Sequence, residues 1–147
     1  MAKYQMIQAT NQNVGAVAVG GLMPMGNITR KISCGGGCEP TFQLASMGDN
    51  TVVISECGYY RVLYNASLEA GAAGVVELTL LVNDVAVYTA QVTATEGGTV
   101  NLTIPYVVRA FANCNSLPTN LPMRLQVRLG TTAVTAGTAN MLVEKVY

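Results

Sequence analysis

Apolar and polar residues alternate along most of the chain with a period of two. The runs are rich in Val, Ile, Thr and Tyr and are bounded by Gly, Asn, Asp or Pro, and no ten-residue stretch shows an apolar face with the 3.6-residue period of a helix. The pattern predicts an all-β chain. The expected strands are Asn27 to Ser33, Thr41 to Ala45, Thr51 to Ser55, Tyr59 to Leu68, Val75 to Val82, Val85 to Thr93, Thr99 to Arg109, Met123 to Leu129 and Ala139 to Tyr147.

The alternation also predicts which side chains point into the core, because successive side chains of a strand lie on opposite faces. Pro105 has no amide hydrogen, so its strand must be an edge strand or be bulged there. Asn83-Asp84 lies between two apolar runs and predicts a hairpin turn, since both residues tolerate positive φ. The expected core sets are Tyr60, Val62, Tyr64, Ala66 and Leu68; Val100, Leu102, Ile104, Tyr106 and Val108; and Met123, Leu125, Val127 and Leu129. The spacing of the strands is that of a sandwich or jelly roll.

The N-terminal segment follows no such pattern. There is no charge from Tyr4 to Thr29, and the string GAVAVGGLMPMG has neither a strand nor a helix period. We interpret residues 1–30 as an extended arm and residues 31–147 as the β domain. An apolar arm is expected to dock on another surface, whereas a floppy terminus is the alternative. The side chains expected to make the attachment are Tyr4, Met6, Ile7, Val14, Val17, Val19, Leu22, Met23 and Met25.

Composition adds a second feature, which is a shortage of charge. The 147 residues suffice for one domain, and only 11% are charged, against about 25% in a typical soluble domain. This shortage suggests that other subunits cover much of the surface. Eight basic residues balance eight acidic ones, which argues against nucleic acid or an anionic membrane as a partner. The N-terminal residues do not show the basic-then-apolar order of a secretory signal.

The chain offers little chemistry for catalysis. It has no histidine, which removes Ser-His and Cys-His pairs and histidine metal sites, and no carboxylate stands in a recognisable catalytic string. The scattered glycines do not form a phosphate-binding loop. We therefore expect a protein that is not an enzyme, with no cofactor and no metal.

The four cysteines leave several states open. Cys34 and Cys38 flank three glycines in CGGGC, so a disulfide between them is one alternative, although a reducing cytoplasm would oppose it. A zinc site would need Cys57 and Cys114 as single ligands from distant strands, without the second close pair typical of zinc ribbons. For Cys57 and Cys114 we expect plain buried or half-buried thiols.

Four strings in order resemble the tumour-necrosis-factor-like or complement-globular-head-like jelly roll. They are TVVISECGYYRVLYNASL, VELTLLVNDVAVYTAQ, TVNLTIPYVVRA and NMLVEKVY. In that family a Gly followed two residues later by Tyr opens a central strand, as Gly58 and Tyr60 do here. An Asn-Gly turn of the family corresponds to Asn83-Asp84. Modules of this type also occur in structural proteins of bacteriophages.

The resemblance implies a homotrimer in which one sheet of each protomer packs around the three-fold axis. The side chains predicted to point out of the core have the composition expected of a subunit interface, because they combine Tyr, Leu, Val and Arg. The alternative for Tyr59 is a partly exposed strand aromatic. The expected interface residues are Tyr59, Arg61, Leu63, Val107 and Arg109.

These features together favour a structural virion protein, assembled in the host cytoplasm. The chain is expected to be a trimeric capsid decoration or head-fibre module, attached to a capsid or another virion protein through its N-terminal arm. The alternative is a tip domain of a phage fibre or bacterial surface protein that binds a host receptor or glycan, although the absence of Trp weakens a sugar site.

Overall fold

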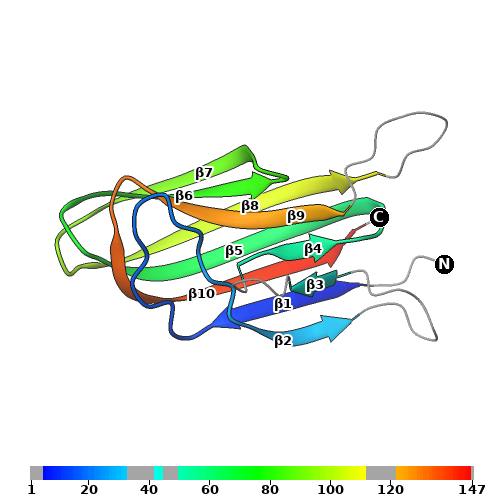
Figure 1. The fold of residues 1–147 in the computed structure, drawn as a ribbon, viewed down its shortest axis with the longest axis horizontal. Helices are drawn as coiled ribbons and strands as arrows, with labels where there is room; N and C mark the ends of the chain where they lie inside the picture. The colour runs from blue at the N-terminus through cyan, green and yellow to red at the C-terminus, as the bar shows by residue number, and fades with distance from the viewer. Residues whose placement is uncertain (1–4, 33–41, 45–49, 112–121, 147) are drawn as a thin grey trace.

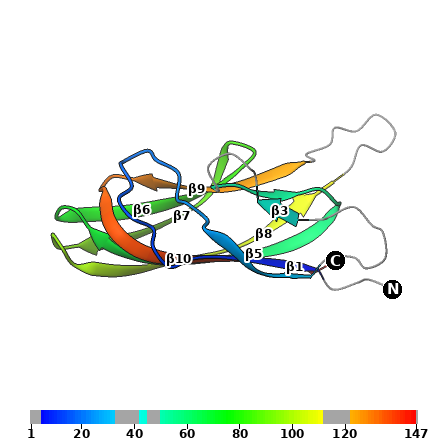
Figure 2. The ribbon, with the colours of Figure 1, turned by 60° about the horizontal axis from the view of Figure 1, so that its bottom comes forward.

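The computed structural model describes residues 5–32, 42–44, 50–111 and 122–146, and it consists of two five-stranded antiparallel sheets packed face to face (Figures 1 and 2). The first sheet has the order β2-β1-β10-β5-β8 and the second the order β3-β4-β9-β6-β7. The strands of the first sheet are β1 (Met6–Asn11), β2 (Asn27–Ile32), β5 (Gly58–Ala70), β8 (Thr99–Ala110) and β10 (Val134–Lys145). Those of the second are β3 (Phe42–Leu44), β4 (Val52–Ile54), β6 (Gly74–Val82), β7 (Val85–Ala94) and β9 (Met123–Gly130).

This architecture confirms the predicted all-β jelly roll. Each of the nine expected strands corresponds to an observed one, and β10 begins five residues earlier than expected, at Val134. Asn83 and Asp84 form the turn between β6 and β7 with φ of 48° and 68°. Pro105 lies in β8, which is an edge strand, as the missing amide hydrogen requires. No helix in the described part of the chain is long and apolar enough to cross a membrane.

The core lies between the two sheets and is built from the predicted alternating sets. From β5, Tyr60, Val62 and Leu68 are fully buried, and the four expected side chains of β9 are also fully buried. Tyr106 is only partly buried, because it lies in the edge strand β8, where its ring packs against Tyr88 with 6.3 Å between centroids. The two sheets thus enclose one continuous apolar layer.

The N-terminal residues are part of this domain, so the prediction of a separate arm was wrong for the residues described. β1 lies between β2 and β10 in the first sheet, and its register pairs Ile7 with Val143 and Ala9 with Met141. Ile7 and Ala9 are each 1% exposed. β1 is only six residues long, and its short Ile7-Gln8-Ala9-Thr10 alternation was too brief to stand out from the polar residues around it.

Residues 12–26 cross from the first sheet to the second and close one side of the core. Val17 exchanges backbone hydrogen bonds with Val134 of β10, and the Met23 amide then donates to the Val127 carbonyl of β9 at 2.7 Å. Figure 2 shows this segment in blue, passing between the two layers. The segment is therefore ordered by contacts with distant strands, and this is why its sequence shows no local hydrophobic period.

Most of the side chains expected to attach the arm to a capsid are instead buried in this core. Val19 is 56% exposed and Leu22 is half-buried, and Tyr4 lies outside the described residues. The buried ones are Met6, Ile7, Val14, Val17, Met23 and Met25. The apolar segment without charge does dock on a surface, and that surface is its own domain.

Gly26 explains how the segment turns back into β2. Its φ is 76°, and a Cβ atom there would lie 2.4 Å from the Thr10 carbonyl oxygen of β1. A larger residue would be strained in its backbone and would also collide with the neighbouring strand. Glycine at this position lets the segment lie directly against β1.

Candidate functional site

The candidate site is the outer face of the first sheet, meaning the side turned away from the second sheet. The predicted interface residues lie together there, because β5 and β8 are paired with Tyr59 opposite Arg109 and Arg61 opposite Val107. Leu63, the fifth, follows on the same side of β5 opposite Pro105. The structure therefore places all five on one continuous surface.

Large apolar side chains are exposed at the end of this face near the chain termini. Tyr59 is 43% exposed and Val107 is 55% exposed. The Arg109 guanidinium lies 5.9 Å from the centroid of the Tyr59 ring and 5.5 Å from that of Phe111, within the range of cation–π contacts. These contacts hold Arg109 along the sheet surface, beside the exposed apolar side chains.

A shallow apolar groove of about 380 Å³ lies beside this area and is mainly lined by carbon atoms. Leu63, Pro105 and Leu142 form its apolar walls. Arg61 and Glu144 form an ion pair within the groove, and Glu144 is only 8% exposed. The carboxylate is therefore already neutralised within the protomer and adds no net charge to the face.

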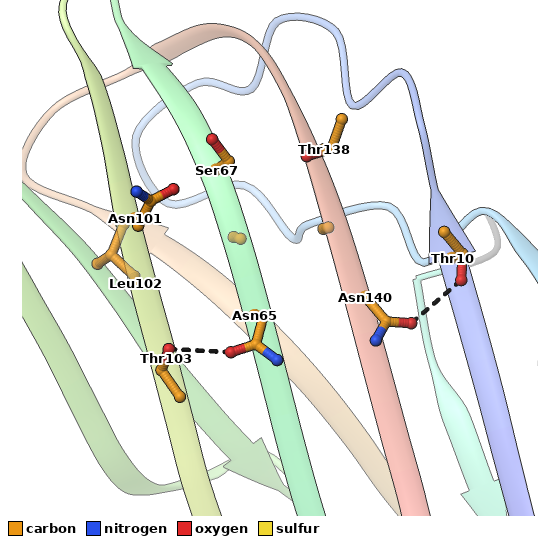
Figure 3. A pocket seen from close by; sticks show the side chains of 10 residues that line it. Thr10, Asn65, Ser67, Asn101, Leu102, Thr103, Thr138 and Asn140 are labelled. Atoms are coloured by element: carbon orange, nitrogen blue, oxygen red, sulfur yellow. Dashed lines mark hydrogen bonds between the residues drawn. The ribbon is translucent and has the colours of Figure 1, made fainter.

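The other half of the face is polar but uncharged, and we call its groove of about 400 Å³ the amide groove. Figure 3 shows it spanning β8, β5, β10 and β1. Its polar lining consists of Thr10, Asn65, Ser67, Asn101, Thr103, Thr138 and Asn140. The alternation in β5 and β8 predicts outward positions for Asn65 and Asn101, but it does not predict a groove there, because an outward Asn on a strand is ordinarily a solvated one.

The amides in this groove have a fixed arrangement of hydrogen bonds. The Asn65 Oδ1 atom accepts a bond from the Thr103 hydroxyl at 2.9 Å. The Asn140 Oδ1 atom accepts from the Thr10 hydroxyl at 3.1 Å and from the Gln8 Nε2 atom at 3.2 Å. Asn65 and Asn140 are also opposite each other in the β5–β10 register. In Figure 3 their amide nitrogens point toward each other across the groove, while both oxygens are engaged.

Two tyrosines provide the clearest shifts in acidity, and both belong to the core. Burial raises the pKa of the Tyr64 phenol well above its ordinary value. Burial, with the nearby Glu56 carboxylate, likewise raises the pKa of the Tyr60 phenol. Tyr60 donates its hydroxyl to the Glu56 carbonyl at 2.7 Å, whereas the buried Tyr64 hydroxyl has no hydrogen-bond partner among the described residues. Neither group is poised to exchange protons near neutral pH.

The cysteines add no site to the described part of the molecule. Cys57 is a free, exposed thiol, which corrects the expectation that it is buried or half-buried; it lies just before β5, where the chain enters the sheet. Cys34, Cys38 and Cys114 lie outside the described residues, so the disulfide between Cys34 and Cys38 stays a prediction. Among residues 5–32, 42–44, 50–111 and 122–146, no group of three or more His, Cys, Asp or Glu side chains could hold a metal ion.

Comparison with known proteins gives similarity at the level of structure alone. No family model matches the chain, and no curated protein sequence matches it. Among solved structures, the globular domain of the zebrafish complement 1qA protein matches with a TM-score of 0.69 and 9% identity, over 97% of this chain and 98% of that one. The Eiger TNF of S. frugiperda matches with a TM-score of 0.69 and 10% identity, over 98% of this chain and 92% of that one.

A viral protein has the same arrangement. The vertex protein P5 of PRD1 matches with a TM-score of 0.59 and 10% identity, over 97% of both chains. At these identities the likeness concerns the fold, and it confirms the resemblance that the four strings indicated. The chain thus has the jelly-roll fold shared by tumour-necrosis-factor-like domains, complement globular heads and a phage vertex protein.

Proposed function

We propose that this chain is a non-enzymatic structural protein of a phage virion, and that it assembles as a homotrimer through the outer face of the first sheet. The observation that carries the proposal is the character of that face. It exposes Tyr59 and Val107, contains the apolar groove, and pairs Arg61 with Glu144 inside the protomer. Apolar surface of this kind is unfavourable in water, so covering the face with a second protomer lowers the free energy.

The virion assignment is supported by the fold of the PRD1 vertex protein and by the low charge of the chain. Within the virion, we propose a capsid decoration or head-fibre module. Because most of the expected arm side chains are in the core, attachment is proposed through the exposed turn that carries Val19.

The direct test is to examine purified particles of the phage or prophage that encodes the chain. Quantitative mass spectrometry should detect the protein in particles, in a copy number that is a multiple of three. Particles from which the protein is absent would contradict the virion assignment. The wild-type protein should cosediment with particles that lack it. The Val19→Asp variant should not, although its native mass is unchanged. Binding of this variant would contradict attachment through the turn that carries Val19.

A further inference from the structure

We infer that the amide groove is the part of the face that makes the assembly specific, through hydrogen bonds from the Asn65 and Asn140 amides to a second copy of this chain. The inference rests on the proposed trimer and adds to it a recognition element in the uncharged half of the face. Its starting point is the pair of amide nitrogens that face each other across the groove (Figure 3). Two donors in this position need an acceptor between or above them.

The bonding pattern leaves these amides as donors. The Asn65 oxygen accepts from Thr103 and the Asn140 oxygen from Thr10 and Gln8, and neither amide nitrogen has a hydrogen-bond partner among the described residues. In a monomer, water satisfies them. When a subunit covers the face, each donor left without an acceptor weakens the assembly by about tenfold or more. A stable trimer must therefore supply acceptors at this place.

The chain carries a matching acceptor at the edge of the same sheet. β8 is an edge strand, so no other strand of the described residues pairs with the backbone groups on its open side. A proline in an edge strand turns its nitrogen side to solvent, and in an antiparallel strand the carbonyl of a residue points to the same side as its nitrogen. Pro105 therefore offers a carbonyl oxygen on the open side with no accompanying N–H.

Donors on the sheet face and an acceptor at the sheet edge are complementary and lie on different surfaces of one chain. A cyclic trimer needs this kind of interface, because each protomer contacts the next through a different patch. A two-fold dimer would instead join one surface to the same surface of the other copy, which does not place the edge strand of one copy over the groove of the next. The arrangement thus fits the head-to-tail interface of the proposed trimer, with the Pro105 edge of one copy over the amide groove of the next.

Replacing each asparagine by leucine tests the inference, because the two explanations predict opposite changes in the dissociation constant of the trimer. Leucine has a similar size but donates no hydrogen bond. We expect Asn65→Leu and Asn140→Leu each to raise the dissociation constant of the trimer by about tenfold. If apolar burial alone drove assembly, the same changes would tighten the trimer, and that result would overturn the inference.

Thr138→Val is the matched control, because it adds an apolar group to the same groove without removing either amide. Its trimer should be as stable as that of the wild type or more so. Mass photometry over a dilution series measures all three variants, and circular dichroism verifies their folding. If a leucine variant does not fold, Asn65→Ser and Asn140→Ser should show the same weakening, because serine is too short to reach the acceptor.

A wild-type chain that is monomeric would contradict the proposed trimer, whereas a wild-type trimer unaffected by these changes would contradict only the amide contacts.

Discussion

At the scale of single residues, the core contains a matched pair of tyrosines. Tyr60 is fully buried and donates to the Glu56 carbonyl, whereas the hydroxyl of the equally buried Tyr64 lacks a partner among the described residues. We expect Tyr64→Phe to leave the free energy of unfolding unchanged or to raise it by up to about 1 kcal/mol, since it removes an unsatisfied polar group. Tyr60→Phe should lower it by about 1 kcal/mol. Urea unfolding at one protein concentration compares the two, and a larger loss in Tyr64→Phe would contradict this description of the core.

The same tyrosines predict how stability depends on pH. Unfolded tyrosine loses its proton near pH 10.0, while burial raises the pKa of Tyr64 in the folded chain. Above about pH 10 the unfolded state binds fewer protons than the folded state, so the free energy of unfolding falls as pH rises. For Tyr64 the fall is about 1.4 kcal/mol per pH unit. Urea unfolding between about pH 9 and 11 should show a shallower fall in Tyr64→Phe than in the wild type. Equal slopes would show that Tyr64 is not buried as described.

At the scale of elements, substitutions in the segment before β2 distinguish a free arm from a segment packed in the core. Met23 is fully buried against the core, while Val19, four residues earlier, is 56% exposed. Met23→Ala should lower the free energy of unfolding by about 2–5 kcal/mol, because it leaves a cavity between the sheets. Val19→Ala should change it by less than about 0.5 kcal/mol. Thermal and urea unfolding provide the comparison. If both changes had similarly small effects, the result would favour a separate N-terminal arm over a segment packed in the core.

The elements also show what the sequence could and could not predict. Strands such as β5 and β9 were predictable because one face is buried along their whole length, which imposes a period of two on the residues. β1 and residues 12–26 were not, since the segment is ordered by backbone bonds to Val134 and Val127, far away in the sequence. The outward positions of the proposed interface residues on β5 and β8 followed from alternation, and their role in a trimer from the family resemblance. The amide groove did not, because it joins four strands whose order only the fold reveals.

At the scale of the whole molecule, a charge placed on the outer face should prevent assembly. Val107 is 55% exposed in the protomer and lies in the proposed interface, so Val107→Asp would bury a carboxylate without a partner. An uncompensated buried charge costs about 3–5 kcal/mol, which corresponds to a loss of trimer affinity of about 100-fold or more. Val85→Asp is the control, since Val85 is 62% exposed on β7 in the other sheet. Native mass over a dilution series should show dissociation of Val107→Asp alone, and dissociation of both variants or of neither would contradict the assignment of this face.

The central claim is that the outer face of the first sheet is covered by further copies of the chain. The most direct measurement is the native mass of the purified full-length protein, by light scattering after size exclusion, with and without reductant. One chain has a mass of 15.4 kDa, and the trimer predicts three times that value in both conditions, because none of the five proposed interface residues is a cysteine. A mass of one chain at micromolar concentration would contradict the trimer and, with it, the role of the face that carries Tyr59, Leu63 and Val107.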